Sequence, residues 1–302
     1  MKILLLGPGG QLGHELQRTL RPLGTLITAG RSDRCEIRAD LGAPESLDAA
    51  LAASCPDLIV NAAAYTAVDQ AESDYETALR INGEALGVIG AYGRQAGAPV
   101  VHFSTDYVFA GDADRPYREE DPVDPVNAYG RSKLAGEKAL RESGADHLIF
   151  RTAWVYGNHG KNFLRSILRH AESRDRLTIV DDQHGAPAWS RMLAQLSTAA
   201  MQRCIDADNW RERSGIYHLS ATGQTSWYGF AEAFLTHAAA SGWIGRAPEL
   251  APIPTSEFPT PAKRPAYSVL DNGRFQKSFG LQVPTWQEQL ALCLADFHQP
   301  HD

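Results

Sequence analysis

The sequence predicts an α/β fold, a Rossmann-like doubly wound parallel sheet with a smaller C-terminal α/β substrate-binding domain. Three observations favour it. A short apolar run at residues 3–6 breaks into glycines and continues at 11–20 as a segment with leucines on one face. Further candidate strands at 25–29, 36–39, 57–61 and 99–109 alternate with helical segments at 44–53 and 75–95. Short, continuously apolar runs are typical of parallel strands covered on both faces.

The glycines after the first strand predict a nucleotide-binding turn. Gly7, Gly10 and Gly13 are spaced three residues apart, at the start of the helix expected at 11–20. In such turns one glycine permits the tight bend, one lets the backbone approach a pyrophosphate, and one allows close helix–strand packing. The N–H groups of the first helical turn, which includes Gln11 and Leu12, would face the phosphates. A glycine triplet alone also fits an ordinary turn, and its position between a strand and a helix favours the nucleotide.

Composition limits the classes of function. The chain has 302 residues, 43% of them hydrophobic, and a net charge of −7, which argues against nucleic acid or an anionic membrane surface as partner. No apolar run approaches the roughly 20 residues of a membrane span. The four cysteines are far apart, as expected in a reducing compartment. We expect a cytoplasmic protein.

We expect two domains, a cofactor-binding domain at 1–155 and a mainly substrate-binding domain at 156–302. Strands near 177–181 and 215–219 are expected to return to the first sheet.

The residues after the second strand bear on the choice of cofactor. An acid there would hold a ribose 2′-hydroxyl, whereas the arginine present, Arg31, suits a 2′-phosphate. The sequence therefore favours NADPH and leaves NADH possible, because Asp33 is close by.

A second motif carries the chemistry. The strand expected at 99–109 presents Ser104 and Thr105, and the carboxyl ends of parallel strands are where ligands bind in open α/β sheets. Tyr129 and Lys133 are four residues apart in the next helical segment, so they share one face. An ammonium beside a phenol would lower the pKa of the phenol and suit it to acid–base catalysis.

Together these motifs resemble the extended short-chain dehydrogenases/reductases, and within them the dTDP-4-dehydrorhamnose reductase family. The glycine spacing, G-x-x-G-x-x-G, is the variant of that superfamily. The matching stretches run nearly the full length, at residues 7–13, 60–69, 104–109, 127–137, 150–156, 182–187 and 259–265. The resemblance implies reduction of dTDP-4-dehydro-L-rhamnose to dTDP-L-rhamnose, a nucleotide sugar, by hydride from NADPH or NADH.

The resemblance also implies roles for residues. Tyr129 would donate the proton, Lys133 would hold the nicotinamide ribose, and Thr105 would bind the sugar carbonyl. Further positions against the cofactor are Asp40, Leu41, Ala62, Ala63, Ala64, Tyr65, Thr66 and Phe103. The implied substrate positions are Val68, Thr105, Asp106, Trp154, Asn162 and Arg264. Trp154 also fits a core aromatic residue, and Arg264 a surface arginine.

Two departures from the family pattern affect minor expectations. Tyr267 stands where relatives have asparagine. Some relatives join two subunits through magnesium held by glutamates. Glu15 matches one of these ligands, but Arg191 stands where a carboxylate is expected. We therefore expect no metal, with Glu15 as a weak candidate ligand, and a monomer or a homodimer.

Three rival functions were weighed. A nucleotide-sugar 4,6-dehydratase would carry glutamate after Thr-Asp, where this chain has Tyr107. A 4-epimerase uses the same tyrosine and lysine and stays open. A non-catalytic regulator that binds NADPH and a partner enzyme also stays open, although the intact set of Thr105, Tyr129 and Lys133 favours catalysis.

Overall fold

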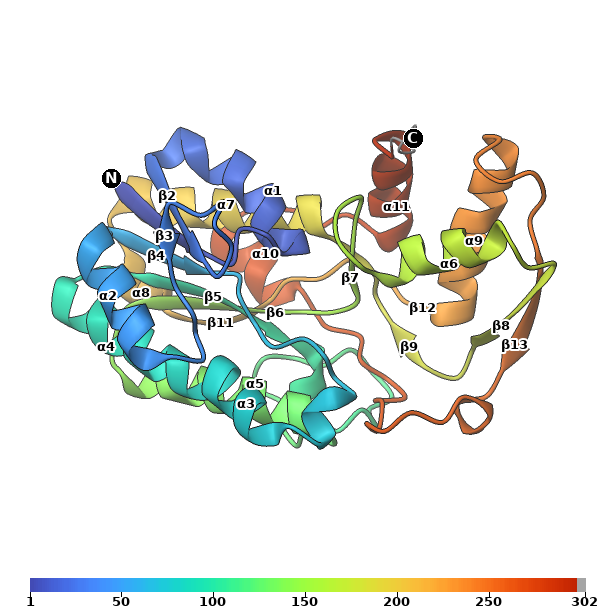
Figure 1. Cartoon of the computed structure of the whole chain (residues 1–302), viewed down its shortest axis with the longest axis horizontal. Coiled ribbons are helices and arrows are strands. Elements are labelled where there is room, and N and C mark those ends of the chain that lie inside the picture. Colours follow the sequence, from blue (N-terminus) through green and yellow to red (C-terminus); the bar gives the residue numbers. More distant parts are fainter. Residues whose placement is uncertain (298–302) are drawn as a thin grey trace.

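A computed structural model describes residues 1–297 and shows two parts that lie side by side (Figure 1). The larger part is built on a parallel sheet of seven strands. In spatial order these are β11 (Gly215–His218), β6 (His147–Thr152), β5 (Val100–Thr105), β4 (Leu58–Asn61), β1 (Lys2–Leu6), β2 (Thr25–Gly30) and β3 (Ile37–Arg38). The strand order reverses between β1 and β4, and ligands bind beyond the strand ends at such a switch point. The predicted fold class is confirmed.

The central strand β1 is buried on both faces. Ile3 and Leu5 belong to one hydrophobic core and Leu4 and Leu6 to the other. This alternation follows from the two-residue period of a strand, which sends successive side chains to opposite faces. An uninterrupted apolar run is therefore required here, since neither face meets water.

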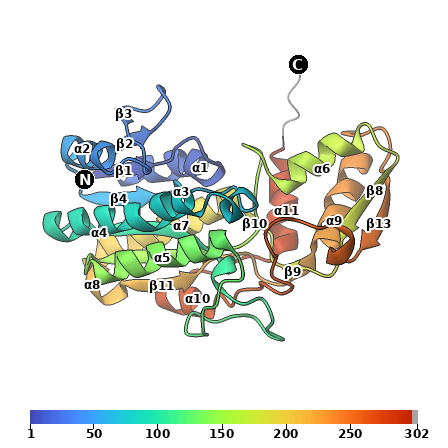
Figure 2. The same cartoon turned by 60° about the horizontal axis from the view of Figure 1, so that its bottom comes forward.

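Helices cover both faces of the sheet, and Figure 2 shows one of the two layers in front of the strands. One layer contains α1 (Gln11–Leu20), α7 (Ser190–Ala207) and α10 (Gly273–Phe279), whose apolar side chains join the core of Ile3 and Leu5. The other layer contains α2 (Pro44–Ser54), α4 (Ala85–Ala96) and α5 (Ala128–Glu142), on the core of Leu4 and Leu6. The short α8 (Trp210–Arg213) precedes β11. Several segments after residue 155 thus belong to the first part of the molecule.

The helix expected at 75–95 is interrupted. It consists of α3 (Tyr75–Leu79), a π-helical turn at Arg80–Glu84, and α4. Such turns are frequent at functional sites. Here the turn holds Asn82, whose side chain accepts a hydrogen bond from the Tyr65 N–H and donates one to the Tyr65 carbonyl. The π-helical turn thus fixes the loop after β4.

The smaller part has its own hydrophobic core. It contains α6 (Phe163–Ala171), α9 (Trp227–Ala240), α11 (Trp286–Ala295) and a two-stranded sheet of β8 (Arg176–Val180) and β13 (Glu249–Ile253). Two further strand pairs are β7 (Val155–Tyr156) with β10 (Ala188–Trp189) and β9 (His184–Gly185) with β12 (Thr225–Ser226). Short 3₁₀ turns lie at Arg21–Leu23, Gln70–Glu72, Asp106–Val108 and Thr255–Glu257.

The expectations for the two late strands have different outcomes. The strand at 215–219 returns to the main sheet as β11, beside β6. The strand near 177–181 does not, and that prediction is wrong, because β8 pairs with β13 in the smaller part. Its burial alternates, with Leu177 and Ile179 inside and Arg176 and Thr178 exposed. A strand with one wet face does not suit the interior of a doubly covered sheet. Within residues 1–297 no helix is both long and apolar enough to cross a membrane.

Candidate active site

The glycine turn joins β1 to α1 and is shaped by backbone contacts. Gly7 has a positive φ of 78°, and a Cβ there would lie 2.7 Å from the backbone of Ala63. A Cβ on Gly13 would lie 2.0 Å from the carbonyl oxygen of Gly7. Gly10 differs, since a Cβ on it would meet only the Gly7 oxygen at an ordinary 3.6 Å. The protein itself thus requires glycine at positions 7 and 13.

The N-terminus of α1 is open to an anion. Its N-cap, Gly10, supplies no side-chain hydrogen bond, and the first turn contains no acidic residue. The N–H groups of Gln11, Leu12 and Gly13 therefore have no capping side chain, and the helix dipole favours negative charge at this end. These residues fit the pyrophosphate of a dinucleotide.

The remaining predicted cofactor residues follow the carboxyl ends of neighbouring strands, apart from Phe103, which is buried within β5. Arg31 is exposed directly after β2, and Asp40 and Leu41 come after β3, where Asp40 accepts a hydrogen bond from the Gly42 N–H. Residues 62–66 form the loop after β4. The side chains predicted to hold one cofactor thus lie along one edge of the sheet.

Thr105 and Tyr129 meet at the end of β5. Thr105 donates a hydrogen bond to Asp106 Oδ1, at 2.9 Å. Burial raises the pKa of Tyr129 to about 12, although a hydrogen bond with Thr105 lowers it. A phenol with this pKa stays protonated at neutral pH and is therefore ready to donate a proton.

The amine of Lys133 contacts strand β5. Its Nζ donates to the Phe103 carbonyl at 2.7 Å and lies 3.0 Å from His102 Nε2. Burial lowers the pKa of Lys133 to about 7, against an opposing effect of Glu137. The expected lowering of the Tyr129 pKa by Lys133 is wrong for this structure, because desolvation dominates at Tyr129.

Long-range contacts fix helix α5. Asn127 caps it by accepting from the Gly130 N–H, and its amide donates to the Lys263 carbonyl. Deeper in the helix, Glu137 forms a buried ion pair with Arg151 at 2.7 Å and accepts from Ser104 at 2.5 Å. The N-terminus and the interior of α5 are thus anchored, which holds Tyr129 and Lys133 in position.

The predicted sugar residues come from separate loops. Arg264 Nη2 donates to Asp69 Oδ2 at 2.8 Å, while Arg264 Nη1 is buried without a partner among the described residues. Asp106 is also buried, its Oδ2 likewise has no partner in residues 1–297, and desolvation raises its pKa to about 6. Val68, next to Asp69, is half-buried. A buried donor and a buried acceptor that lack partners suit a polar ligand.

Trp154 stands on a strained backbone. Its φ is +48°, uncommon for a bulky residue, and its ring stacks on Trp227 with centroids 3.5 Å apart. Gly185 makes room, since a Cβ there would lie 2.4 Å from the indole of Trp154. Such strain is typical of functional sites. Tyr267, the departure noted in the sequence, donates to Gln224.

Asn162 lies apart from Arg264, although both were expected near a diphosphate. Its side chain caps α6 and donates to Gln11 Oε1 at 2.9 Å, so it belongs to the glycine turn. Arg264, by contrast, faces Asp69 and Tyr107.

Glu15, the weak candidate for a metal ligand, faces a side-chain cation. Arg191 donates to Glu15 at 3.0 Å and to Asp296 at 2.6 Å. No group of three or more metal-ligating side chains is found within residues 1–297. The magnesium of some relatives does not fit here, because a guanidinium already neutralises these carboxylates.

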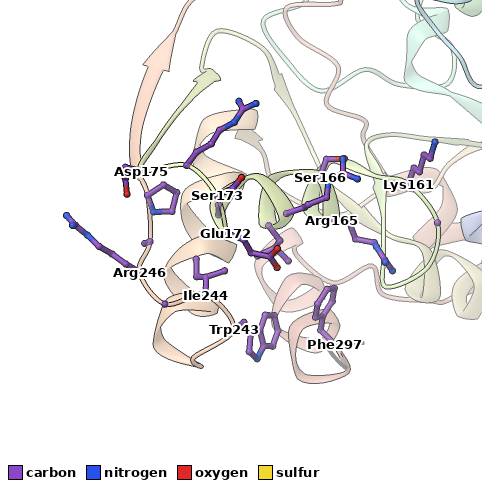
Figure 3. Close-up of a pocket in the computed structure, with 18 residues that line it drawn as sticks. Lys161, Arg165, Ser166, Glu172, Ser173, Asp175, Trp243, Ile244, Arg246 and Phe297 are labelled. Atoms are coloured by element: carbon purple, nitrogen blue, oxygen red, sulfur yellow. The ribbon is translucent and has the colours of Figure 1, made fainter. Parts of the chain in front are cut away.

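A groove of about 1140 Å³ lies between α6 and the loop at residues 243–248, in the smaller part (Figure 3). Basic side chains such as Lys161 and Arg246 surround it. Its described lining contains none of Thr105, Tyr129 and Lys133. The candidate active site is therefore identified by its chemistry and not by its volume.

Sequence reasoning missed several residues that support the site. Asn127 directly precedes a helix and is a preferred N-cap residue, so its role was detectable. His102 and Asn61 are polar residues in otherwise apolar strands, and buried polar groups need hydrogen-bond partners. The pairing of Glu137 with Arg151 had no local signal.

Comparison with known proteins agrees with this geometry. The profile of the family described as RmlD substrate binding domain matches residues 1–299. A dTDP-4-dehydrorhamnose reductase of Burkholderia thailandensis is 48% identical over 308 residues, covering 98% of this chain and 99% of that protein. The protein of the same name from Escherichia coli K12 is 44% identical over 289 residues, or 95% of each.

Solved structures agree as well. A Bacillus anthracis dTDP-4-dehydrorhamnose reductase in complex with NADP has a TM-score of 0.86 at 30% identity, covering 98% of this chain and 99% of that one. An orthologue from Clostridium acetobutylicum has a TM-score of 0.86 at 34% identity, covering 99% and 100%. The resemblance drawn from the motifs is confirmed, and the chain belongs to the RmlD substrate binding domain family.

Proposed function

We propose that this chain reduces dTDP-4-dehydro-β-L-rhamnose to dTDP-β-L-rhamnose with NADPH, the last step in making that nucleotide sugar. The observation that carries the proposal is the hydrogen bond between Thr105 and Tyr129 at the end of β5, with the buried Lys133 one turn further along the helix of Tyr129. The relatives named dTDP-4-dehydrorhamnose reductase support it over nearly the full chain.

NADPH would be held by the glycine turn and the neighbouring strand ends. When bound, it supplies the hydride that reduces the C4 ketone. The uncapped N–H groups of Gln11, Leu12 and Gly13 bind the pyrophosphate. Arg31, exposed after β2, suits a 2′-phosphate, and the Bacillus anthracis relative was solved with NADP.

Proton transfer falls to Tyr129. Its phenol gives a proton to the oxygen that develops charge at C4, and the raised pKa keeps that proton in place at neutral pH. Thr105 donates to Asp106 in this structure and would turn that hydroxyl proton to the C4 carbonyl oxygen to orient it. Positioning of this kind supplies much of the rate of such enzymes.

The sugar nucleotide would be bound by residues from both parts of the molecule. Arg264 offers its unpartnered Nη1 to an anionic or carbonyl oxygen, and Asp106 offers its unpartnered Oδ2 to a sugar hydroxyl. Val68 and Trp154 supply apolar walls, and Asn162 supports the turn that holds the cofactor. A cytoplasmic location is part of the same proposal. Monomer and homodimer both stay open.

The test follows the absorbance of NADPH, and separately of NADH, after addition of dTDP-4-dehydro-L-rhamnose made in situ. We expect stoichiometric oxidation with dTDP-L-rhamnose as product, faster with NADPH. Tyr129→Phe should abolish most of this oxidation, and Tyr228→Phe is its matched control, because Tyr228 lies on α9 and its hydroxyl donates to Glu232, outside the proposed site. A folded protein that binds NADPH but oxidises neither cofactor would overturn the proposal and favour the epimerase or the regulator.

A further inference from the structure

A buried chain of hydrogen bonds runs beneath the site. The Ala63 N–H donates to Asn61 Oδ1 at 3.1 Å, and Asn61 Nδ2 lies 3.2 Å from His102 Nδ1. On the other side of the ring, His102 Nε2 lies 3.0 Å from Lys133 Nζ. Asn61 and His102 are fully buried and Lys133 nearly so. The chain links the loop expected to face the cofactor with Lys133.

Donor and acceptor chemistry fixes where the protons lie. Because the Asn61 oxygen already accepts from a backbone N–H, its amide nitrogen must face His102 and donate. Nδ1 of His102 is therefore the unprotonated nitrogen. A neutral imidazole then carries its proton on Nε2, which points at Lys133.

An Nε2–H group can donate to Lys133 only if the amine has a free lone pair. An ammonium has three donors and no acceptor, so it would place two donors against each other at 3.0 Å. Charging Lys133 requires the His102 proton to move to Nδ1, and the Asn61 amide must then turn and release the Ala63 N–H. The three side chains thus change state together.

We propose that His102, set by Asn61, is a positioning residue that holds Lys133 as a neutral amine and couples the charging of that amine to the cofactor loop. This deepens the proposed function, since it concerns the group expected to hold the nicotinamide ribose. Burial lowers the pKa of both His102 and Lys133, against the opposing effects of the Asn61 backbone on His102 and of Glu137 on Lys133, which agrees with two neutral partners.

The other titratable groups near Lys133 do not favour its charged form strongly enough to change this assignment of a neutral amine. Glu137, one turn along α5, raises the pKa of Lys133, but its charge is paired with Arg151 at 2.7 Å. Tyr129, one turn earlier, is a protonated phenol and carries no charge at neutral pH. Local charge alone therefore does not hold a proton on Lys133.

The first test is the tautomer of His102, by long-range proton–nitrogen NMR on protein labelled at its ten histidines. His102→Gln assigns the signal. We expect a protonated Nε2 and an unprotonated Nδ1 in the cofactor-free protein. A protonated Nδ1 would overturn the inference. This readout needs no turnover, so it stands apart from the proposed function.

The second test uses Asn61→Asp, which keeps the shape of the side chain. A carboxylate accepts from both Ala63 and His102, so it moves the imidazole proton to Nδ1 and frees Nε2 to accept from an ammonium. We expect the His102 tautomer to switch, and the pH at which NADPH binding weakens to rise by at least about one unit. His102→Gln, whose carbonyl oxygen can accept from the ammonium, should shift binding in the same direction.

His218→Gln is the matched control. His218 is another fully buried imidazole. It lies on β11, and its Nδ1 is hydrogen-bonded to the Tyr117 carbonyl. It should lose stability but keep the pH dependence of NADPH binding and the His102 tautomer. Folded Asn61→Asp and His102→Gln proteins whose NADPH binding follows the parental pH profile would reject the coupling.

Discussion

The cofactor half and the sugar half of the site are built in different ways. The centre of the cofactor half is backbone, since the glycine turn leaves no room for a Cβ at Gly7 or Gly13, and most of the other predicted cofactor residues follow neighbouring strand ends. The sugar half consists of side chains from distant loops, such as Asp69 with Arg264, separated by 195 residues. A single added Cβ is therefore expected to disrupt the whole glycine turn, whereas a substitution in the sugar half removes one side-chain contact. Tyr129 stands where the two halves meet.

The largest effect is expected at that junction. Tyr129→Phe removes the proton donor and keeps the ring, so kcat should fall by about 10²–10⁴. NADPH affinity, which belongs to the other half, should stay near the parental value. Steady-state kinetics and a binding titration measure the two separately. Near-parental turnover would mean that Tyr129 is not the acid.

The glycine turn offers a matched pair of variants. Gly13→Ala places a Cβ 2.0 Å from the Gly7 oxygen and 3.0 Å from the Pro8 Cα, both backbone atoms that must move. We expect a loss of about 1–3 kcal/mol in the free energy of unfolding and a large loss of NADPH affinity.

Gly10→Ala is the comparison, because its Cβ meets only one protein atom, at 3.6 Å, and its φ of −75° suits alanine. Its stability should stay within about 0.5 kcal/mol of the parent. Any loss of NADPH affinity in Gly10→Ala would therefore come from a clash between the new methyl group and the cofactor, and not from a change in the fold. Equal stability of the two variants in urea unfolding would refute the backbone account.

A smaller effect is expected in the sugar half, where a substitution should raise the free energy of unfolding instead of lowering it. The pKa of Asp106 is raised from 3.8 to about 6 by burial. The unfolded chain therefore releases this proton first, and stability falls as pH rises from about 4 to about 6. Above that range Asp106→Asn should be more stable than the parent by up to about 3 kcal/mol.

The same variant should resemble the parent in stability near pH 4, which unfolding curves at both pH values check. It should also lose affinity for the sugar nucleotide, as expected of a destabilising residue that is kept for function. An Asp106→Asn protein less stable than the parent at pH 7 would show that the charged carboxylate is well solvated.

The same contrast explains what the sequence could reveal. The glycine turn, strand β5 and the spacing of Tyr129 and Lys133 are local patterns, and their positions follow from strand and helix periods. The direction of the Lys133 amine depends on His102, 31 residues away, and the pKa of Tyr129 depends on burial by the whole fold. The placement of β8 was misjudged because its five residues do not show which sheet they join, although their alternation was visible. Long-range partners such as Arg151 and Asp296 left no local pattern.

The smallest effect concerns Arg191, outside both halves. Its guanidinium joins Glu15, a nearly buried carboxylate, to Asp296. Within residues 1–297, Arg191→Ala leaves Glu15 with Arg18, at 3.9 Å, as its remaining ion-pair partner. It should lower the free energy of unfolding by about 1–2 kcal/mol, less than for a fully buried pair because Asp296 is partly exposed. Turnover should not change.

Arg191→Glu instead brings three carboxylates together, so millimolar magnesium should raise its melting temperature and leave that of the parent unchanged. A parent that magnesium stabilises by several degrees would show that the guanidinium does not take the place of a metal.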